Sequence, residues 1–367
     1  MNKIIIYLKN FDWVLFGAVI LLICFGLAEL YSIALSQGIT SSINFKKQIF
    51  FVVLGILIMF VLAFFDYYNW RSFSHYLYLA GGLLLLGVLF FGRTVRGTTG
   101  WYEFGGLSLQ PVEFAKFILI VFLARYFSSN VINLKPLKHF FLSGVSVGLF
   151  IFLVLKQPDF GSAVILFFFW AIMLVISGIR KRYLVVVALI SILVFLAGWF
   201  FFFKDYQKER IKTFFAPERY SLDQGYNIRQ AIIAVGSGRL WGRGIGFGSQ
   251  SQLKFLPEAQ NDFIFAVVAE ELGLLGVSLV LGLFAIIFYR LLAATRKVNN
   301  DFGIYFLLGT AVLIFIEMFI NIGMNIGILP IIGISLPFLS YGGSAIISTL
   351  MLIGVAESII IRSKLKY

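Results

Sequence analysis

The sequence has 367 residues, of which 60% are hydrophobic and 13% charged, whereas soluble domains are roughly 45–50% apolar and about 25% charged. So little polar material cannot cover a soluble particle, which excludes a cytosolic enzyme and a disordered chain. The single cysteine, Cys24, excludes an internal disulfide and a cysteine-based metal cluster, and we interpret it as a small packing residue. The net charge of +13 would suggest nucleic acid in a soluble protein, but this composition indicates a membrane.

Apolar runs along the chain are long enough to cross a bilayer, which takes about 20 residues each. The ten runs lie at 14–36, 48–66, 73–92, 111–128, 139–156, 160–178, 183–203, 263–290, 303–326 and 341–361. No repeat with a period of roughly 20–50 residues is present. We therefore predict an all-α polytopic membrane protein of ten transmembrane helices, with residues 1–367 forming one integral membrane domain.

Lysine and arginine in the loops predict the orientation, because cytoplasmic loops are enriched in both. With the N-terminus inside, the cytoplasmic segments hold fifteen basic residues and the short outer loops hold five. Both termini are therefore predicted to be cytoplasmic, and the basic run at 180–182 is interpreted as a topogenic anchor. A large extracytoplasmic loop at about 204–262, between helices 7 and 8, contains a short helical pattern at 228–235, so we expect order and function there.

Charged residues within predicted spans are costly and usually mark function. Glu113 and Lys116 share one helix face at their spacing, and we expect an ion pair that faces the bundle interior. Glu113 has an ordinary alternative as an acid in the first turn of a helix that begins at Pro111. Glu270 and Glu271 follow in the eighth span, and at least one of them is expected to point inward.

Two further acids stand where outer loops meet helices. Asp159 lies in a tight turn at 157–161, where it either caps the next helix or faces a cavity. Asp262 stands at the outer mouth of the eighth span. It is either the N-cap of that helix or a carboxylate at the water–lipid boundary that accepts a proton from a sugar hydroxyl.

Six glycines between Gly236 and Gly248 superficially suggest a nucleotide loop. No strand precedes them and no ribose-binding acid follows, so a dinucleotide fold is set aside. With Arg239, Arg243 and Lys254 interleaved, two interpretations stay open. The segment is either a backbone cradle for a phosphate-bearing lipid headgroup or a flexible turn region.

Five motifs in order carry a resemblance to a known family. They are Trp101 with 110–116, then 157–161, 236–238, 255–273 and 336–344. On these residues the chain resembles the SEDS family (shape, elongation, division and sporulation proteins), polytopic peptidoglycan glycosyltransferases that work with class B penicillin-binding proteins. The segments 248–252 and 321–324 look more like the elongation member RodA than the division member FtsW.

The resemblance implies ten spans with a large outer loop, broadly like GT-C glycosyltransferases, in the cytoplasmic (inner) membrane. It implies lipid II as the substrate, an inverting transfer with Asp262 as the catalytic base, a membrane-embedded ion pair of Glu113 and Lys116, and Asp159 as an acid facing the cavity. Further substrate-binding or cavity residues are Trp101, Gln110, Arg239, Arg243, Glu258 and Ser344. No metal ligand is assigned, and a divalent cation, Mg²⁺ or Mn²⁺, is left open as an aid to the departing charge.

The chain departs from the family pattern at three positions. Val112 and Asn261 stand where serine and threonine are usual, and Gly100 stands where the family commonly has an arginine before Trp101. The lost arginine weakens the case for pyrophosphate binding there, and Arg93 or Arg96 is the candidate substitute.

Other functions remain open at this point. A lipid II flippase would also carry buried charges, although no inverted repeat is visible and Asp262 lies at one mouth, not at the midplane. A non-catalytic scaffold for a penicillin-binding protein, a division-specific FtsW-type member and a related O-antigen ligase or polymerase are further alternatives. Nucleic acid is not expected as a partner.

Overall fold

The computed structural model describes residues 3–37, 39–95, 97–130, 136–179, 205–215 and 224–365, with a few single residues between 183 and 200. The predicted span at 183–203 lies largely outside this part of the chain, as do Arg96 and the basic run at 180–182. The helices in the first half are α1 (Lys3–Asn10), α2 (Trp13–Gln37), α3 (Ile39–Phe64), α4 (Tyr67–Phe91), α5 (Pro111–Asn130), α6 (Pro136–Lys156) and α7 (Phe160–Ile176). Those in the second half are α9 (Asp205–Phe215), α10 (Gln224–Ser237), α11 (Ser249–Gln252), α12 (Ile264–Thr295), α13 (Asp301–Asn325) and α14 (Gly343–Leu365).

Seven of the described helices are long and apolar enough to cross a membrane, namely α2, α3, α4, α6, α12, α13 and α14. Helix α5, which carries Glu113, Lys116 and Arg125, lies outside this set, and so does α7 with its 17 residues. The prediction of a helical, multi-pass membrane protein is confirmed, whereas the number of ten spans stays a prediction. The expected helix at 228–235 is confirmed as α10.

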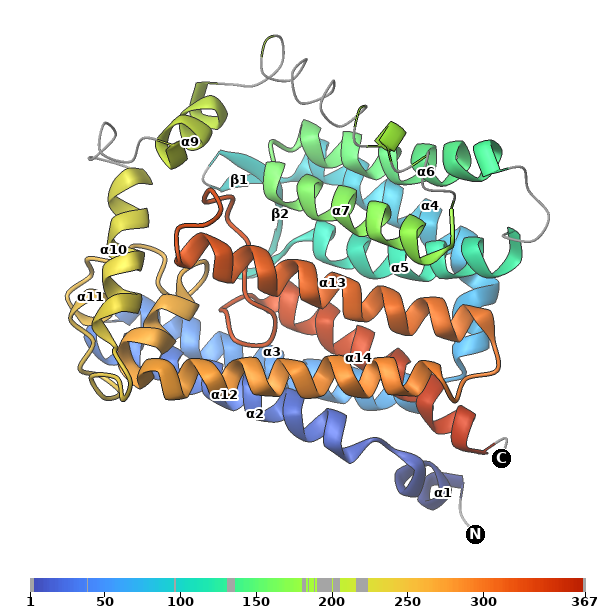
Figure 1. Cartoon of the computed structure of the whole chain (residues 1–367), viewed down its shortest axis with the longest axis horizontal. Helices are drawn as coiled ribbons and strands as arrows, with labels where there is room; N and C mark the ends of the chain where they lie inside the picture. Colours follow the sequence, from blue (N-terminus) through green and yellow to red (C-terminus); the bar gives the residue numbers. More distant parts are fainter. Residues whose placement is uncertain are drawn as a thin grey trace.

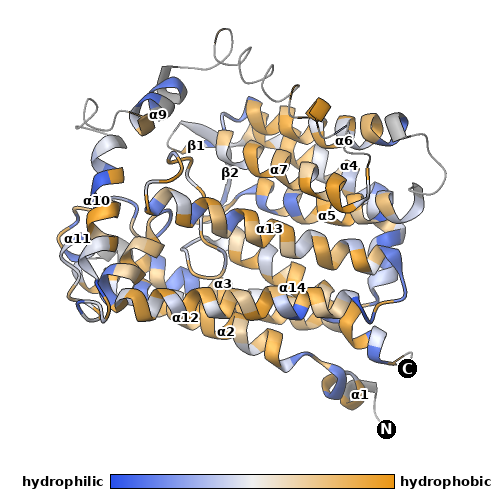
Figure 2. Cartoon of the chain, viewed as in Figure 1, coloured by the Kyte–Doolittle hydropathy of each residue, from blue (hydrophilic) through white to orange (hydrophobic). Residues whose placement is uncertain are grey.

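The long helices run side by side along the molecule (Figure 1). Both termini lie at one end, and α10 and α11 lie at the other. Figure 2 shows hydrophobic residues along the long helices and hydrophilic ones concentrated in α9 and near the helix ends. Large apolar side chains such as Leu83, Phe90 and Phe91 are exposed, as expected where lipid replaces water as the solvent. Cys24 is also exposed on α2, so its interpretation as a packed core residue was wrong.

Helix α14 lies at the centre of the bundle, because 83% of its apolar window is buried, against 22% for α4. It packs closely on α3, and a Cβ atom at Gly354 would lie only 2.6 Å from the Met59 carbonyl oxygen. Small residues of this kind let membrane helices approach each other. The first turn of α14 is thereby held beside α3 and α5, where the site described below is found.

A small antiparallel sheet joins α4 to α5, which the all-α prediction did not anticipate. Its strands β1 (Arg93–Val95), β2 (Thr98–Phe104) and β3 (Leu107–Leu109) pair in the order β1-β2-β3. Gly105 and Gly106, both with positive φ, form the two-residue turn between β2 and β3. The sheet places Trp101 on its middle strand.

Helix α12 is broken at Gly273, whose φ of 65° and ψ of −161° are not helical. The preceding Glu270 and Glu271 are both buried, in agreement with the expectation that at least one points inward. The main-chain N–H groups of Gln250 and Ser251 donate to the Glu270 carboxylate, and that of Gly246 donates to Glu271. These two acids therefore fasten the glycine-rich segment to the kink in α12.

Candidate functional site

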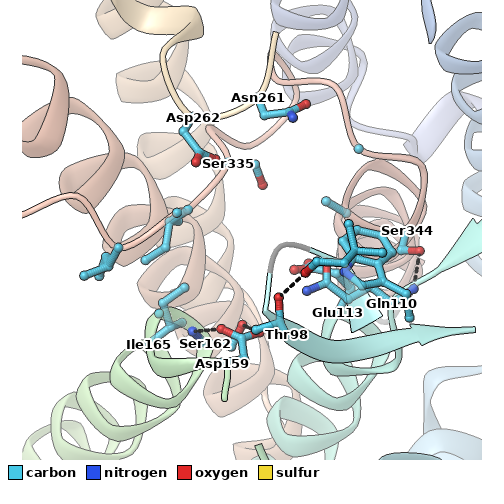
Figure 3. Close-up of a pocket in the computed structure, with 18 of the residues that line it drawn as sticks. Thr98, Gln110, Glu113, Asp159, Ser162, Ile165, Asn261, Asp262, Ser335 and Ser344 are labelled. Carbon is cyan, nitrogen blue, oxygen red and sulfur yellow. Dashed lines mark hydrogen bonds between the residues drawn. The ribbon is translucent and has the colours of Figure 1, made fainter. Parts of the chain in front are cut away.

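A cavity of about 310 Å³ opens between the sheet, the start of α5, the turn before α7 and the start of α14. Figure 3 shows Asp262 on one side, Glu113, Gln110 and Ser344 on another, and Asp159 with Ser162 on a third. Seven of the ten predicted site residues line this cavity, namely Trp101, Gln110, Glu113, Lys116, Asp159, Asp262 and Ser344. They come from segments up to 243 residues apart in the chain, so only the fold brings them together.

Asp262 is half-buried in the cavity wall. Helix α12 begins at Ile264 and its N-cap residue is Phe263, so Asp262 is not the N-cap of this helix. Its carboxylate lies beside the 330–335 segment, since a Cβ atom at Gly333 would be 3.6 Å from Asp262 Oδ2. The interpretation of Asp262 as the N-cap of this helix was therefore wrong, and the residue lines the cavity.

Helix α13 holds the main chain of Asp262. The side-chain amides of Asn321 and Asn325, both fully buried, each donate to the Asp262 carbonyl over 2.9 Å. The Ser340 hydroxyl donates to the carbonyl of Asn261 over 2.6 Å. The position of Asp262 is thus set from two directions, by α13 and by the turn before α14. Sequence reasoning did not assign this role to the two asparagines.

Asp159 fulfils both of the roles considered for it. It is the N-cap residue of α7, where its Oδ1 accepts from the Ser162 main-chain N–H over 3.0 Å and its Oδ2 accepts from the Ser162 hydroxyl over 2.7 Å. The same side chain lines the cavity. A capped helix start is a natural place for a fixed carboxylate.

Lys116 is bonded by two carboxylates. Its Nζ lies 2.8 Å from Glu113 on the same helix and 2.5 Å from Glu317 on α13, and all three side chains are buried. Glu113 and Lys116 also line the cavity. The expected inward-facing pair is present, and it is a triad whose third member, Glu317, sequence reasoning missed. The rule that charge within a span marks a partnered site would have found it.

The start of α14 and the turn before it contribute two further groups to the cavity lining. The Gln110 main-chain N–H donates to the Ser344 hydroxyl over 2.9 Å, which joins the start of α5 to the start of α14. Tyr341 lines the cavity as well.

Three predicted cavity residues lie elsewhere. Arg239 and Arg243 are exposed in the segment that is fastened to the kink of α12, and Arg243 donates to the Ser249 hydroxyl. Glu258 lies in the turn before Asp262, where its carboxylate accepts from the Asn261 side chain over 2.7 Å. None of them lines this cavity, and their assignment to substrate binding stays a prediction.

At position 100, where the family commonly has an arginine, the described structure shows no basic residue in its place. Gly100 is buried, and a Cβ atom there would lie 3.5 Å from Gln157 Oε1. Arg93 forms an ion pair with Glu103 on the exposed sheet, and Arg96 lies outside the described residues.

The charge of the cavity is acidic. Among its described lining residues Lys116 is the only basic side chain, facing the carboxylates of Glu113, Asp159 and Asp262. The described residues contain no group of three or more His, Cys, Asp or Glu side chains that could hold a metal ion. Lys116 is the positive charge that the described lining of this cavity offers an anionic substrate.

The model of a cell cycle protein family that takes in FtsW, RodA and SpoVE matches residues 12–365. The chain belongs to this family. Recognition of the SEDS family from the five sequence motifs is thereby confirmed.

Relatives within the family cover most of the chain. It is 37% identical over 315 residues to the peptidoglycan glycosyltransferase MrdB of Escherichia coli K12, which covers 86% of this chain and 85% of that protein. It is 36% identical over 319 residues to a probable peptidoglycan glycosyltransferase FtsW of Coxiella burnetii, covering 85% of this chain and 84% of that one.

Solved structures of family members share the fold. The rod shape determining protein RodA of Thermus thermophilus superposes with a TM-score of 0.72 at 26% identity, over 95% of this chain and 96% of that one. A chain of a peptidoglycan synthase complex that coordinates polymerization and crosslinking superposes with a TM-score of 0.79 at 28% identity, over 97% and 98%.

Proposed function

We propose that this protein is a peptidoglycan glycosyltransferase that polymerises lipid II into glycan strands, with the cavity beside Asp262 as its active site. The observation that carries the proposal is the placement of Asp262, whose main chain is clamped at the cavity wall across from Glu113 and Asp159. The names of the relatives support the same activity.

The topology that suits this activity has ten spans in the cytoplasmic membrane, with both termini in the cytoplasm and the 204–262 loop outside. Two observations support it. Both termini lie at the end of the bundle opposite α10 and α11, and the loop between α12 and α13 carries Arg296 and Lys297 at the same end as the termini. The whole chain, residues 1–367, then forms one membrane domain whose cavity opens outward.

In the proposed reaction Asp262 takes the proton from the 4-hydroxyl of the GlcNAc sugar of an acceptor lipid II. The hydroxyl oxygen then bonds to C1 of the donor MurNAc with inversion, while the bond from C1 to the pyrophosphate oxygen breaks. The lipid pyrophosphate leaves with its electron pair, and Lys116 is the described cavity cation that can stabilise it. No ATP is required, because the sugar–pyrophosphate bond supplies the activation.

We further propose that the protein works with a class B penicillin-binding protein in cell elongation. The similarity to a synthase complex supports such a partner. The near-equal identities to MrdB and FtsW do not separate elongation from division. The proposal of an elongation role rests on the RodA-like segments at 248–252 and 321–324.

The test is a lipid II polymerisation gel with the purified full chain, with and without the partner transpeptidase. Wild-type protein should form a ladder of glycan strands, and Asp262→Ala should not. Asp301→Asn, at the exposed start of α13, is the matched control and should polymerise normally. A scrambling assay in proteoliposomes tests the flippase alternative, and transport of lipid II without any polymer would overturn the proposal.

A further inference from the structure

Residues 238–255 expose an unusual combination of side chains, and we call them the glycine-rich segment. Six large apolar residues in it are exposed, namely Leu240, Trp241, Ile245, Phe247, Leu253 and Phe255. Trp241 and Phe247 are the extremes, with exposed fractions of 79% and 76%. The segment also contains three basic residues and no acidic residue. The cavity uses none of these side chains.

The glycine-rich segment is held rigidly against the kink of α12. The break in the helix at Gly273 leaves main-chain N–H and C=O groups on both sides of the kink without partners inside the helix. The glycine-rich segment forms hydrogen bonds with these groups. Arg243 and Gly244 donate from their N–H groups to the carbonyls of Glu270 and Glu271, while Leu274 and Leu275 donate to the carbonyls of Arg239 and Leu240. The exposed side chains are thus displayed in a fixed arrangement.

The depth of the segment follows from the length of α12. Beyond the kink, residues 274–295 measure about 33 Å at a rise of 1.5 Å per residue, which matches a hydrocarbon core about 30 Å thick. Leu274 and Leu275 therefore mark one boundary of the bilayer, with Arg296 at the other. Because the segment pairs with Leu274 and Leu275, it lies at the boundary between headgroups and hydrocarbon, where tryptophan is enriched and basic side chains meet phosphates.

The exposed apolar surface continues onto a lipid-facing surface. Leu274, Leu275 and Leu279 of α12 are about half-exposed, and the first two are the residues that pair with Arg239 and Leu240. Lipid covers these leucines in a spanning helix, and the same lipid meets the segment at the boundary. The excess of basic over acidic residues favours anionic headgroups.

We propose that the glycine-rich segment is a lipid-binding surface, which inserts Trp241 and Phe247 into the bilayer boundary and binds the phosphates of anionic phospholipids through Arg239, Arg243 and Lys254. Its assignment to the outer leaflet rests on the topology under the proposed function. The lipid contact itself requires only that α12 spans the membrane. The surface would fix the kink of α12, and with it the helix that begins after Asp262, relative to the membrane.

The experiment measures lipid contact directly, without turnover. In full-length protein with Cys24→Ser, Phe247→Cys carries an environment-sensitive fluorophore, and the protein is placed in nanodiscs of phosphatidylcholine with phosphatidylglycerol. Leu253→Cys gives a second position in the segment. Leu279→Cys, on the lipid-facing side of the span, and Asn299→Cys, exposed between α12 and α13, are the lipid and aqueous controls.

The proposal predicts that labels at 247 and 253 are shielded from aqueous iodide relative to the label at 299. They should be quenched by brominated phosphatidylglycerol more than by equal amounts of brominated phosphatidylcholine, since each basic residue near an anionic surface strengthens attraction roughly fivefold. Substituting Arg239→Gln, Arg243→Gln and Lys254→Gln together should abolish that preference.

Iodide access at 247 and 253 equal to that at 299 would overturn the proposal and indicate a surface that meets water or a protein partner. Equal quenching by the two brominated lipids, unchanged by the triple substitution, would overturn the role of the basic residues. A protein that behaves as predicted here but fails to polymerise lipid II would contradict only the proposed function.

Discussion

The side-chain amide of Asn325 donates a hydrogen bond over 2.9 Å to the main-chain carbonyl of Asp262. The other end of the same amide accepts from the Ala266 N–H over 3.1 Å. Asn325 therefore bridges the chain on both sides of the first turn of α12, and it does so from a fully buried position on α13. The proposed catalytic aspartate is positioned through its main chain by a neighbouring membrane helix.

Substituting Asn325→Asp should slow polymerisation by about tenfold at saturating lipid II, because a carboxylate keeps the acceptor for Ala266 but has no amide to donate to Asp262. The apparent KM should stay unchanged, since the asparagine does not line the cavity. Initial rates over a lipid II series measure both. Wild-type rates in a folded Asn325→Asp protein would show that the clamp has no role in positioning.

Lys116→Met should destabilise the protein by about 3–5 kcal/mol, because it leaves the carboxylates of Glu113 and Glu317 buried without their cation. Thermal unfolding in detergent measures the loss. Adding Glu317→Gln to Lys116→Met should recover part of it, because one of the two uncompensated charges is removed. A double variant less stable than Lys116→Met would contradict the triad, and Lys297→Met at the exposed surface is the neutral control.

Asp159→Asn should separate the two roles of that side chain. Asparagine caps helices as well as aspartate does, so the melting temperature should stay close to that of the wild type. The negative charge in the cavity is lost, and polymerisation should fall. Asp159→Ala should lose the cap as well, at about 1 kcal/mol. Full activity of a stable Asp159→Asn protein would assign this residue to capping alone.

Gly242→Ala should detach the glycine-rich segment from α12. A Cβ atom at Gly242 would lie 2.1 Å from the Glu271 carbonyl oxygen, whereas one at Gly246 would meet nothing within 4 Å. Both residues have positive φ, so Gly246→Ala carries the conformational cost of roughly 1–2 kcal/mol alone. Limited proteolysis within 238–255 should be faster in Gly242→Ala than in Gly246→Ala. Equal rates would mean that close packing at Gly242 does not hold the segment.

The apolar runs predicted most of the helices closely, because about 20 apolar residues have few alternatives to a spanning helix. The run at 14–36 is α2, and that at 303–326 is α13. Helix α3 begins at Ile39, earlier than the run at 48–66, because charged Lys46 and Lys47 are tolerated near the N-terminal end of a spanning helix. The break at Gly273 was not predicted, because the main-chain groups that it leaves open pair with a segment distant in the chain.

The sequence pointed to site residues where a charged side chain stands in or beside an apolar run, as Glu113, Lys116 and Asp262 do. The bonds from Asn321 and Asn325 to the Asp262 carbonyl were not predicted, because only the fold shows which carbonyl a side-chain amide meets. Arg239 and Arg243 could not be placed from the sequence either. Their charge suggested a phosphate nearby, but charge alone cannot tell a cavity from an outer surface.

The central claim is that the Asp262 carboxylate removes the proton of the acceptor hydroxyl. Asp262→Asn keeps the shape of the side chain and removes the base, so it should lower the initial rate of lipid II polymerisation by about 10²–10⁴-fold. Expression, melting temperature and binding of the partner transpeptidase should match the wild type. The measurement is the initial rate of glycan strand formation by purified Asp262→Asn and wild-type protein under the same conditions. A rate within a few-fold of the wild type would contradict the account.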